Sequence, residues 1–88
     1  MLYTFSRSDY SLDELERYLA NAGINDAIVL WQNGVLLALK YPNLFEGCFA
    51  LQQDIEARGL QAMNLKVQLI SLTDLVGLTE RYFPQLAL

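Results

Sequence analysis

Short apolar runs alternate along the chain with stretches in which hydrophobic residues recur every three or four positions. The runs are typical of strands and the stretches of amphipathic helices. Strands are predicted at residues 2–6, 27–31, 48–51 and 67–70. The run 27–31 is apolar throughout, which is the pattern of a strand covered on both faces, so we expect it at the centre of the sheet.

Capping patterns mark the starts of two helices. Ser11 is followed three positions later by Glu14, and Ser71 by Asp74, so each pair can form a capping box in which hydroxyl and carboxylate bond each other's backbone N–H groups. The apolar face of the last helix is expected to consist of Leu72, Leu75, Val76, Thr79 and Tyr82. The residues expected to stop helices, including a further helix over 52–58, are Gly23, Gly59 and Pro84.

The segment Gln32-Asn33-Gly34 is ambiguous. Asn-Gly between two apolar runs is a strong hairpin signal. Residues 35–39, however, are mostly Leu and Ala and do not alternate, and Tyr41-Pro42 breaks the chain as it would after a short helix. We therefore predict a strand, a tight loop and a short helix.

Strands that alternate with helices imply right-handed crossovers between parallel strands. With 88 residues, the chain has room for one hydrophobic core, so residues 1–88 are expected to form a single domain. The predicted fold class is α/β, a three-layer α/β/α sandwich around a small, mainly parallel sheet of four to five strands.

Composition limits the classes of partner. The net charge is -4 and there is no run of basic residues, so direct nucleic-acid binding is not expected. The apolar runs fall far short of the roughly 20 residues that span a bilayer, and the first residues lack the basic region of a signal peptide. We expect a cytoplasmic protein without a membrane span. Hydrophobic residues make up 53% of the chain, which is high for this size and predicts apolar surface for a partner.

The sequence offers little reactive chemistry. Histidine is absent and Cys48 is the only cysteine. Its apolar neighbours place Cys48 at the start of a buried strand, where we expect it to pack rather than to react. Glycine-rich phosphate loops and metal-ligand sets are also absent. We therefore predict no catalytic residues, cofactor or metal, and do not expect the chain to be an enzyme by itself.

The loops after the strands are the remaining places for a site, because ligands of open α/β sheets bind at the carboxyl ends of strands. There, Asn33-Gly34 is most simply a turn that needs positive φ, and Asp54 with Arg58 a solvent-exposed ion pair. Five aromatic residues exceed what so small a core readily encloses: Trp31, Tyr41, Phe45, Tyr82 and Phe83. The candidate partner or cleft contacts are Trp31, Gln32, Asn33, Gly34, Arg58, Tyr82 and Phe83.

The order of these motifs resembles the TusB/DsrH family of small α/β proteins, nearly from end to end. The segments that carry the resemblance are residues 1–8, 29–35, 50–60 and 74–79. The most specific is the strand-helix stretch that ends Asp54-Ile55-Glu56-Ala57-Arg58-Gly59, and the second is Gln32-Asn33-Gly34-Val35.

The resemblance implies a TusB-like, non-catalytic subunit of a sulfur-relay complex. In that family, two trimers of TusB, TusC and TusD form a heterohexamer that accepts a persulfide from TusA. A cysteine of TusD passes the sulfur towards TusE, for 2-thiolation of the tRNA wobble uridine. An isolated subunit of this kind is expected to self-associate.

Two alternatives remain open. The first is a DsrH-like sulfur carrier of intracellular sulfur oxidation that uses Cys48 as the acceptor. The second is a stand-alone module that binds a small ligand over the Asn33-Gly34 loop.

Overall fold

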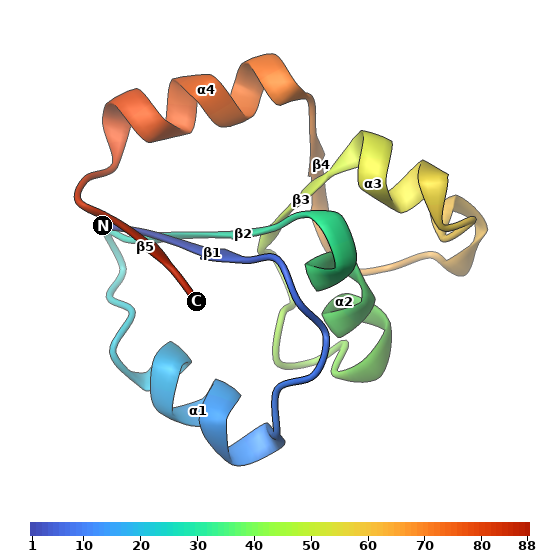
Figure 1. The fold of residues 1–88 in the computed structure, drawn as a ribbon, viewed down its shortest axis with the longest axis horizontal. Helices are drawn as coiled ribbons and strands as arrows, with labels where there is room; N and C mark the ends of the chain where they lie inside the picture. Colours follow the sequence, from blue (N-terminus) through green and yellow to red (C-terminus); the bar gives the residue numbers. More distant parts are fainter.

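A computed structural model describes residues 1–88 as a five-stranded sheet in which every neighbouring pair is parallel, with the order β4-β3-β2-β1-β5 (Figure 1). The strands are β1 (Leu2–Phe5), β2 (Ala27–Leu30), β3 (Phe49–Leu51), β4 (Gln68–Ile70) and β5 (Gln85–Ala87). The central position of β2 and the α/β fold class are as the sequence predicts.

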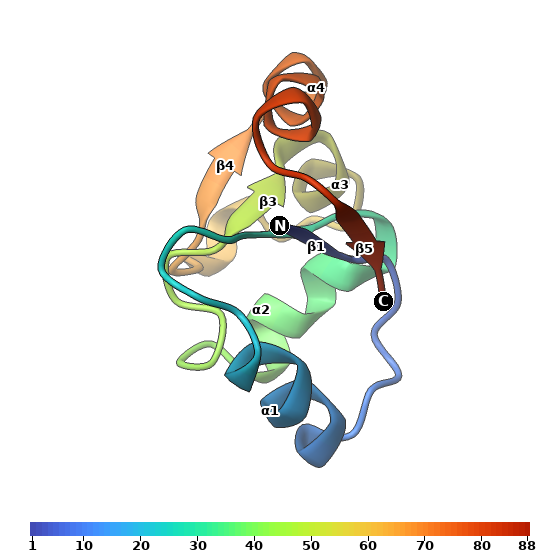
Figure 2. The same cartoon turned by 90° about the vertical axis from the view of Figure 1, so that its left-hand side faces the viewer.

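Helices lie on both faces of the sheet, so the molecule has three layers (Figure 2). The α-helices are α1 (Leu12–Ala20), α2 (Leu36–Lys40), α3 (Gln52–Ala57) and α4 (Leu72–Arg81), with 3-10 segments η1 (Gln32–Val35) and η2 (Gln61–Met63). The first four strands follow one another across the sheet, and right-handed crossovers therefore place α1, α2 and α3 on one face. The connection from β4 returns across the whole sheet to β5, which places α4 on the opposite face.

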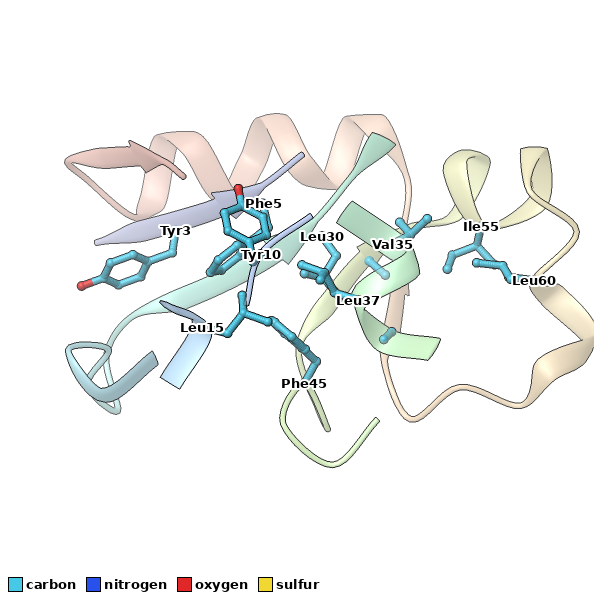
Figure 3. Close-up of a cluster of buried hydrophobic side chains, with 12 residues drawn as sticks. Tyr3, Phe5, Tyr10, Leu15, Leu30, Val35, Leu37, Phe45, Ile55 and Leu60 are labelled. Carbon is cyan, nitrogen blue, oxygen red and sulfur yellow. The ribbon is translucent and has the colours of Figure 1, made fainter. Parts of the chain in front are cut away.

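The larger core lies between the sheet and the three helices α1 to α3. Figure 3 shows its side chains converging from β1, β2, α1, α2 and α3. The Phe5 ring is fully buried, and Tyr10 and Phe45 meet it edge-on with centroids 5.4 Å and 5.7 Å away. Such packing explains why so short a chain holds three helices against one sheet face.

A smaller core lies under α4, and α4 alone covers it. Six buried residues form this core: Leu2, Ala27, Val29, Leu51, Ile70 and Leu78. Leu75 and Tyr82 also pack there, but Leu72 and Val76 are 53% and 52% exposed. The predicted apolar face of the last helix is therefore divided, with one half on the sheet and the other half open to solvent.

The helix ends differ in part from the prediction. The Ser71–Asp74 capping box is complete, whereas in α1 the Ser11 hydroxyl accepts from the backbone N of Glu14 without the reciprocal bond. Gly59 ends α3 with a φ of 66°, as expected.

Gly23 does not stop α1, and Pro84 lies beyond the end of α4. The helix α1 ends at Ala20, capped by Asn21, whose Nδ2 bonds the carbonyl of Arg17 at 3.2 Å. The helix α4 ends at Arg81, three residues before the proline.

Strand β5 has no counterpart among the predicted ranges. It pairs with β1, so that Leu2 N donates to the Pro84 carbonyl at 3.0 Å and Leu88 N donates to the Thr4 carbonyl at 2.8 Å. Both termini therefore lie at the same side of the sheet (Figure 1). None of the helices is long and apolar enough to cross a membrane.

Candidate functional site

The loop after β2 is a 3-10 turn that lies against the end of β1. A Cβ atom added at Gly34 would stand 1.9 Å from the carbonyl oxygen of Phe5, so no larger residue fits without a shift of the backbone. The positive φ in this loop, 52°, is at Gln32. Gly34 is therefore required for close approach between two segments, and not for the positive-φ turn that the sequence suggests.

Asp54 of α3 and Arg58, which caps the end of that helix, hold this loop in place. Arg58 donates to Oδ1 of Asn33 from Nε at 3.2 Å and from Nη2 at 2.8 Å. Oδ2 of Asp54 accepts from the backbone N of Gln32 at 2.7 Å. The Arg58 and Asp54 side chains are 26% and 16% exposed and lie 3.7 Å apart, so the pair is a partly buried tether and not the solvent-exposed pair expected from their spacing.

The tether leaves few groups free for a ligand. Besides Asn33, the Arg58 guanidinium donates from Nη1 to the Asp54 carbonyl at 3.2 Å. Its donors and the Asp54 carboxylate are thus directed at neighbours within the cluster. The cluster is suited to fixing the conformation of a surface loop, because a charged side chain that donates two hydrogen bonds to one acceptor restricts both side chains.

Five of the seven predicted contact residues meet at the carboxyl end of the sheet: Trp31, Gln32, Asn33, Gly34 and Arg58. Tyr82 and Phe83 lie at the amino end, because α4 runs back across the sheet and ends beside the start of β1 (Figure 1). The structure therefore divides these residues between two places.

The aromatic residues also differ in burial. Phe45 is fully buried, and Trp31, Tyr41 and Tyr82 are partly buried against the two cores. Phe83 alone among them is largely open, at 74% exposure. The predicted aromatic surface is therefore reduced to one strongly exposed ring, two residues beyond the end of α4.

The thiol of Cys48 lies directly before β3 and packs against the larger core. Burial raises its pKa from the ordinary 9.0 to about 11, because desolvation penalises the thiolate. No cationic side chain counters this effect. Since the thiolate is the nucleophile in sulfur transfer, the setting of Cys48 opposes that chemistry at neutral pH.

A surface cleft of about 320 Å³ lies between α4 and the β3–β4 side of the sheet, and none of the sites predicted from the sequence includes it. Its lining residues include Phe49, Ile70, Thr73, Gly77 and Arg81. One signal was present: Gly77 stands inside a helix, where glycine is unfavourable, and no atom lies within 4 Å of where its Cβ would be. The cleft lining contains one carboxylate, that of Asp74, and its Oδ2 already accepts from the N–H of Ser71.

Comparison with known proteins places the chain among bacterial relatives. The DsrH-like protein family matches residues 7–85. An uncharacterized protein of Haemophilus influenzae is 53% identical over the full length of both chains. Proteins named TusB are 39% identical in Photorhabdus laumondii and 40% identical in Yersinia pestis, each covering 99% of both chains.

The fold has a solved counterpart as well. The solution NMR structure of protein Tm0979 from Thermotoga maritima has a TM-score of 0.67 and 30% sequence identity, and the match covers 92% of this chain and 93% of that one. The agreement therefore includes nearly all of the sheet and its helices. Sequence and fold together show that this chain belongs to the DsrH-like family, in which proteins named TusB are full-length relatives.

Proposed function

We propose that this chain is a non-catalytic subunit of a sulfur-relay complex. The observation that carries the proposal is the chemical setting of Cys48 in a member of this family. A thiol with a pKa of about 11 has very little thiolate at neutral pH, so a persulfide would have to be held by another subunit. The role left for this chain is to assemble with that subunit.

In the finer form of the proposal, the partners are TusC-like and TusD-like subunits. Two trimers form a heterohexamer in the cytoplasm, TusA-like and TusE-like proteins act before and after it, and the sulfur reaches the wobble uridine of tRNA. The resemblance to TusB over the whole chain supports this form. The open half of α4 and the exposed Phe83 support assembly in general, because unpartnered apolar surface is typical of interfaces.

Co-purification tests the assembly. The chain is expressed with its TusC-like and TusD-like counterparts, only one of which carries a tag, and the product is sized by light scattering. A stable complex that contains all three chains is expected. If the chain is recovered without the others, the proposed subunit role is wrong.

Mass spectrometry tests the non-catalytic part. The complex is loaded by a persulfide donor, and each subunit is then examined for a mass gain of one sulfur atom. The gain is expected on a partner and not on this chain. A gain on this chain that disappears in Cys48→Ser would instead establish the DsrH-like carrier.

A further inference from the structure

The outer edge of β5 presents backbone groups that have no partner. In a parallel ladder, alternate residues of an edge strand bond the neighbouring strand. The bonds of Pro84 O to Leu2 and of Leu88 N to Thr4 show that residues 84, 86 and 88 face β1. The N–H and C=O groups of Gln85 and Ala87 therefore point away from the sheet. Figure 2 shows β5 at the end of the sheet, beside β1.

This edge is short but carries no charged side chain to protect it. Edge strands are commonly blunted by lysine or other charged side chains. Residues 82–88 contain no charged side chain, and all three residues of β5 are exposed. Two apolar side chains flank the open backbone, those of Phe83 and of Leu86, which is 44% exposed.

The open half of α4 continues the same surface. Leu72, at the start of the helix, lines a hollow with Gln52 and Glu56 of α3. Val76, one turn further on, is 52% exposed on the side away from the cleft next to β3 and β4, towards β5. A hydrogen bond from Gln85 Nε2 to the Thr79 carbonyl, 3.3 Å long, joins helix and strand there. The unpaired backbone and the neighbouring apolar side chains together form one surface, which we call the β5 edge surface: Val76, Phe83, Gln85, Leu86 and Ala87.

The other edge of the sheet is less suited to a partner. Within β4, the bond from Gln68 N to the Cys48 carbonyl leaves only Leu69 facing outward. At its end, the N–H of Ser71 already donates to Asp74 Oδ2 at 3.0 Å. The charged Lys66 also stands just before the strand. The two edges are therefore unequal, and β5 is the more open.

We infer that the β5 edge surface receives an extended, uncharged strand of a partner subunit, which adds to the sheet beside β5. Backbone groups spaced two residues apart are matched by another strand, and the exposed side chains of Val76, Phe83 and Leu86 favour apolar side chains on that strand. The inference rests on the proposed function, since the partner is a subunit of the same complex. Beyond that function, the inference specifies the surface through which this chain assembles and the extended conformation of the partner segment that binds there.

Proline at position 87 tests the backbone part. Ala87→Pro removes an N–H that faces the partner, while the bonds to β1 come from residues 84, 86 and 88. Phe83→Ser removes the exposed ring. Met63→Ser is the matched control, because Met63 is 53% exposed on η2, at the opposite edge. Affinity for the purified TusC-like and TusD-like pair is measured by calorimetry, with circular dichroism to check the fold.

Ala87→Pro and Phe83→Ser are each expected to weaken binding roughly tenfold or more, since each removes an interface group and leaves its counterpart unpaired. Met63→Ser should bind like the unmodified chain. Unchanged affinity in both folded variants overturns the inference and leaves the subunit role intact. Absence of binding by the unmodified chain overturns both. If Ala87→Pro abolishes self-association but not binding to the pair, the edge serves a second copy and the inference is wrong.

Discussion

The guanidinium of Arg58 directs both Nε and Nη2 at one atom, Oδ1 of Asn33, across 25 residues of sequence. This contact joins the helix after β3 to the loop after β2. Asn33 and Arg58 therefore have a structural role. Their contact fixes the loop that lies close against the end of β1 at Gly34.

Replacing Arg58 by lysine should expose that role. Lysine keeps the charge but cannot fork onto one acceptor, so Arg58→Lys is expected to lower the free energy of unfolding by about 1–2 kcal/mol in urea titrations. A double-mutant cycle with Asn33→Ala should give a coupling energy of at least about 0.5 kcal/mol. Arg17→Lys, on the exposed face of α1, is the control and should have almost no effect. Additive effects of the two substitutions would contradict the tether.

Two glycines should respond in opposite ways to alanine. Gly34→Ala places a methyl group on the Phe5 carbonyl and is expected to destabilise the fold by about 3 kcal/mol or more. Gly77→Ala meets no atom within 4 Å and lies inside α4, so it should stabilise by about 0.5–1 kcal/mol. Thermal unfolding of both variants measures the difference. A tolerated Gly34→Ala would mean that the loop does not approach β1 this closely in solution.

Cys48 should react slowly with alkylating reagents. With its pKa raised by burial to about 11, the fraction of thiolate at pH 8 is about a hundredfold below that of an ordinary thiol. The rate of modification by iodoacetamide should still be rising at pH 10, and unfolding in urea should restore ordinary reactivity. A rate that levels off near pH 8 in the folded protein would contradict this setting.

The same shift links Cys48 to stability in alkaline solution. Its pKa is higher in the folded state than in the unfolded chain, so the neutral thiol favours folding fully below pH 9.0, and this contribution is lost as the pH rises towards 11. Cys48→Ala should make the unfolding free energy less dependent on pH in that window. An unchanged dependence would assign the alkaline loss of stability to other groups.

Asp26 should govern stability in acid. Its Oδ2 accepts from the backbone N of Gly23 and its Oδ1 from the amino group of Met1, both at 2.8 Å, and these bonds lower its pKa. A lowered pKa favours folding above the pKa of the unfolded chain, and the benefit disappears as the pH falls through the folded value. Asp26→Asn should therefore destabilise the protein at pH 6, and its difference from the unmodified chain should shrink as the pH falls below the ordinary aspartate pKa of 3.8. A difference that stays constant with falling pH would contradict the linkage.

The strands that the sequence predicts are those with mostly apolar runs, and for the central strand the reason is physical. A strand buried on both faces must be apolar throughout, so β2 is recognisable from residues 27–31 alone. Strand β5 lies at an edge and is exposed, as β4 does, but Gln85–Ala87 lacks the β-branched residues that mark 67–70 as a strand. The strand forms because it pairs with β1, and the residues within and next to β5 do not indicate that pairing.

The candidate site was predictable only in part, for a related reason. Asn33 and Arg58 could be singled out by their place after strands, but their mutual contact depends on the positions of β2 and β3 in the sheet. The spacing of Asp54 and Arg58 indicates an exposed helix pair, and only the neighbouring loop makes it partly buried. The open half of α4 likewise looks the same in sequence as the half that packs.

The pairing of β1 with β5 also has a consequence for the order of folding. Leu2 pairs with Ala27 of β2 and also with Gln85 of β5, which is much farther away in the sequence. Closing the longer loop costs more conformational entropy, so β1 to β4 are expected to pair first, and α4 and β5 to dock last. Until then the outer edge of β1 is open and the smaller core has no helix over it, which favours the encounter with partners at that moment, while the sheet is being closed.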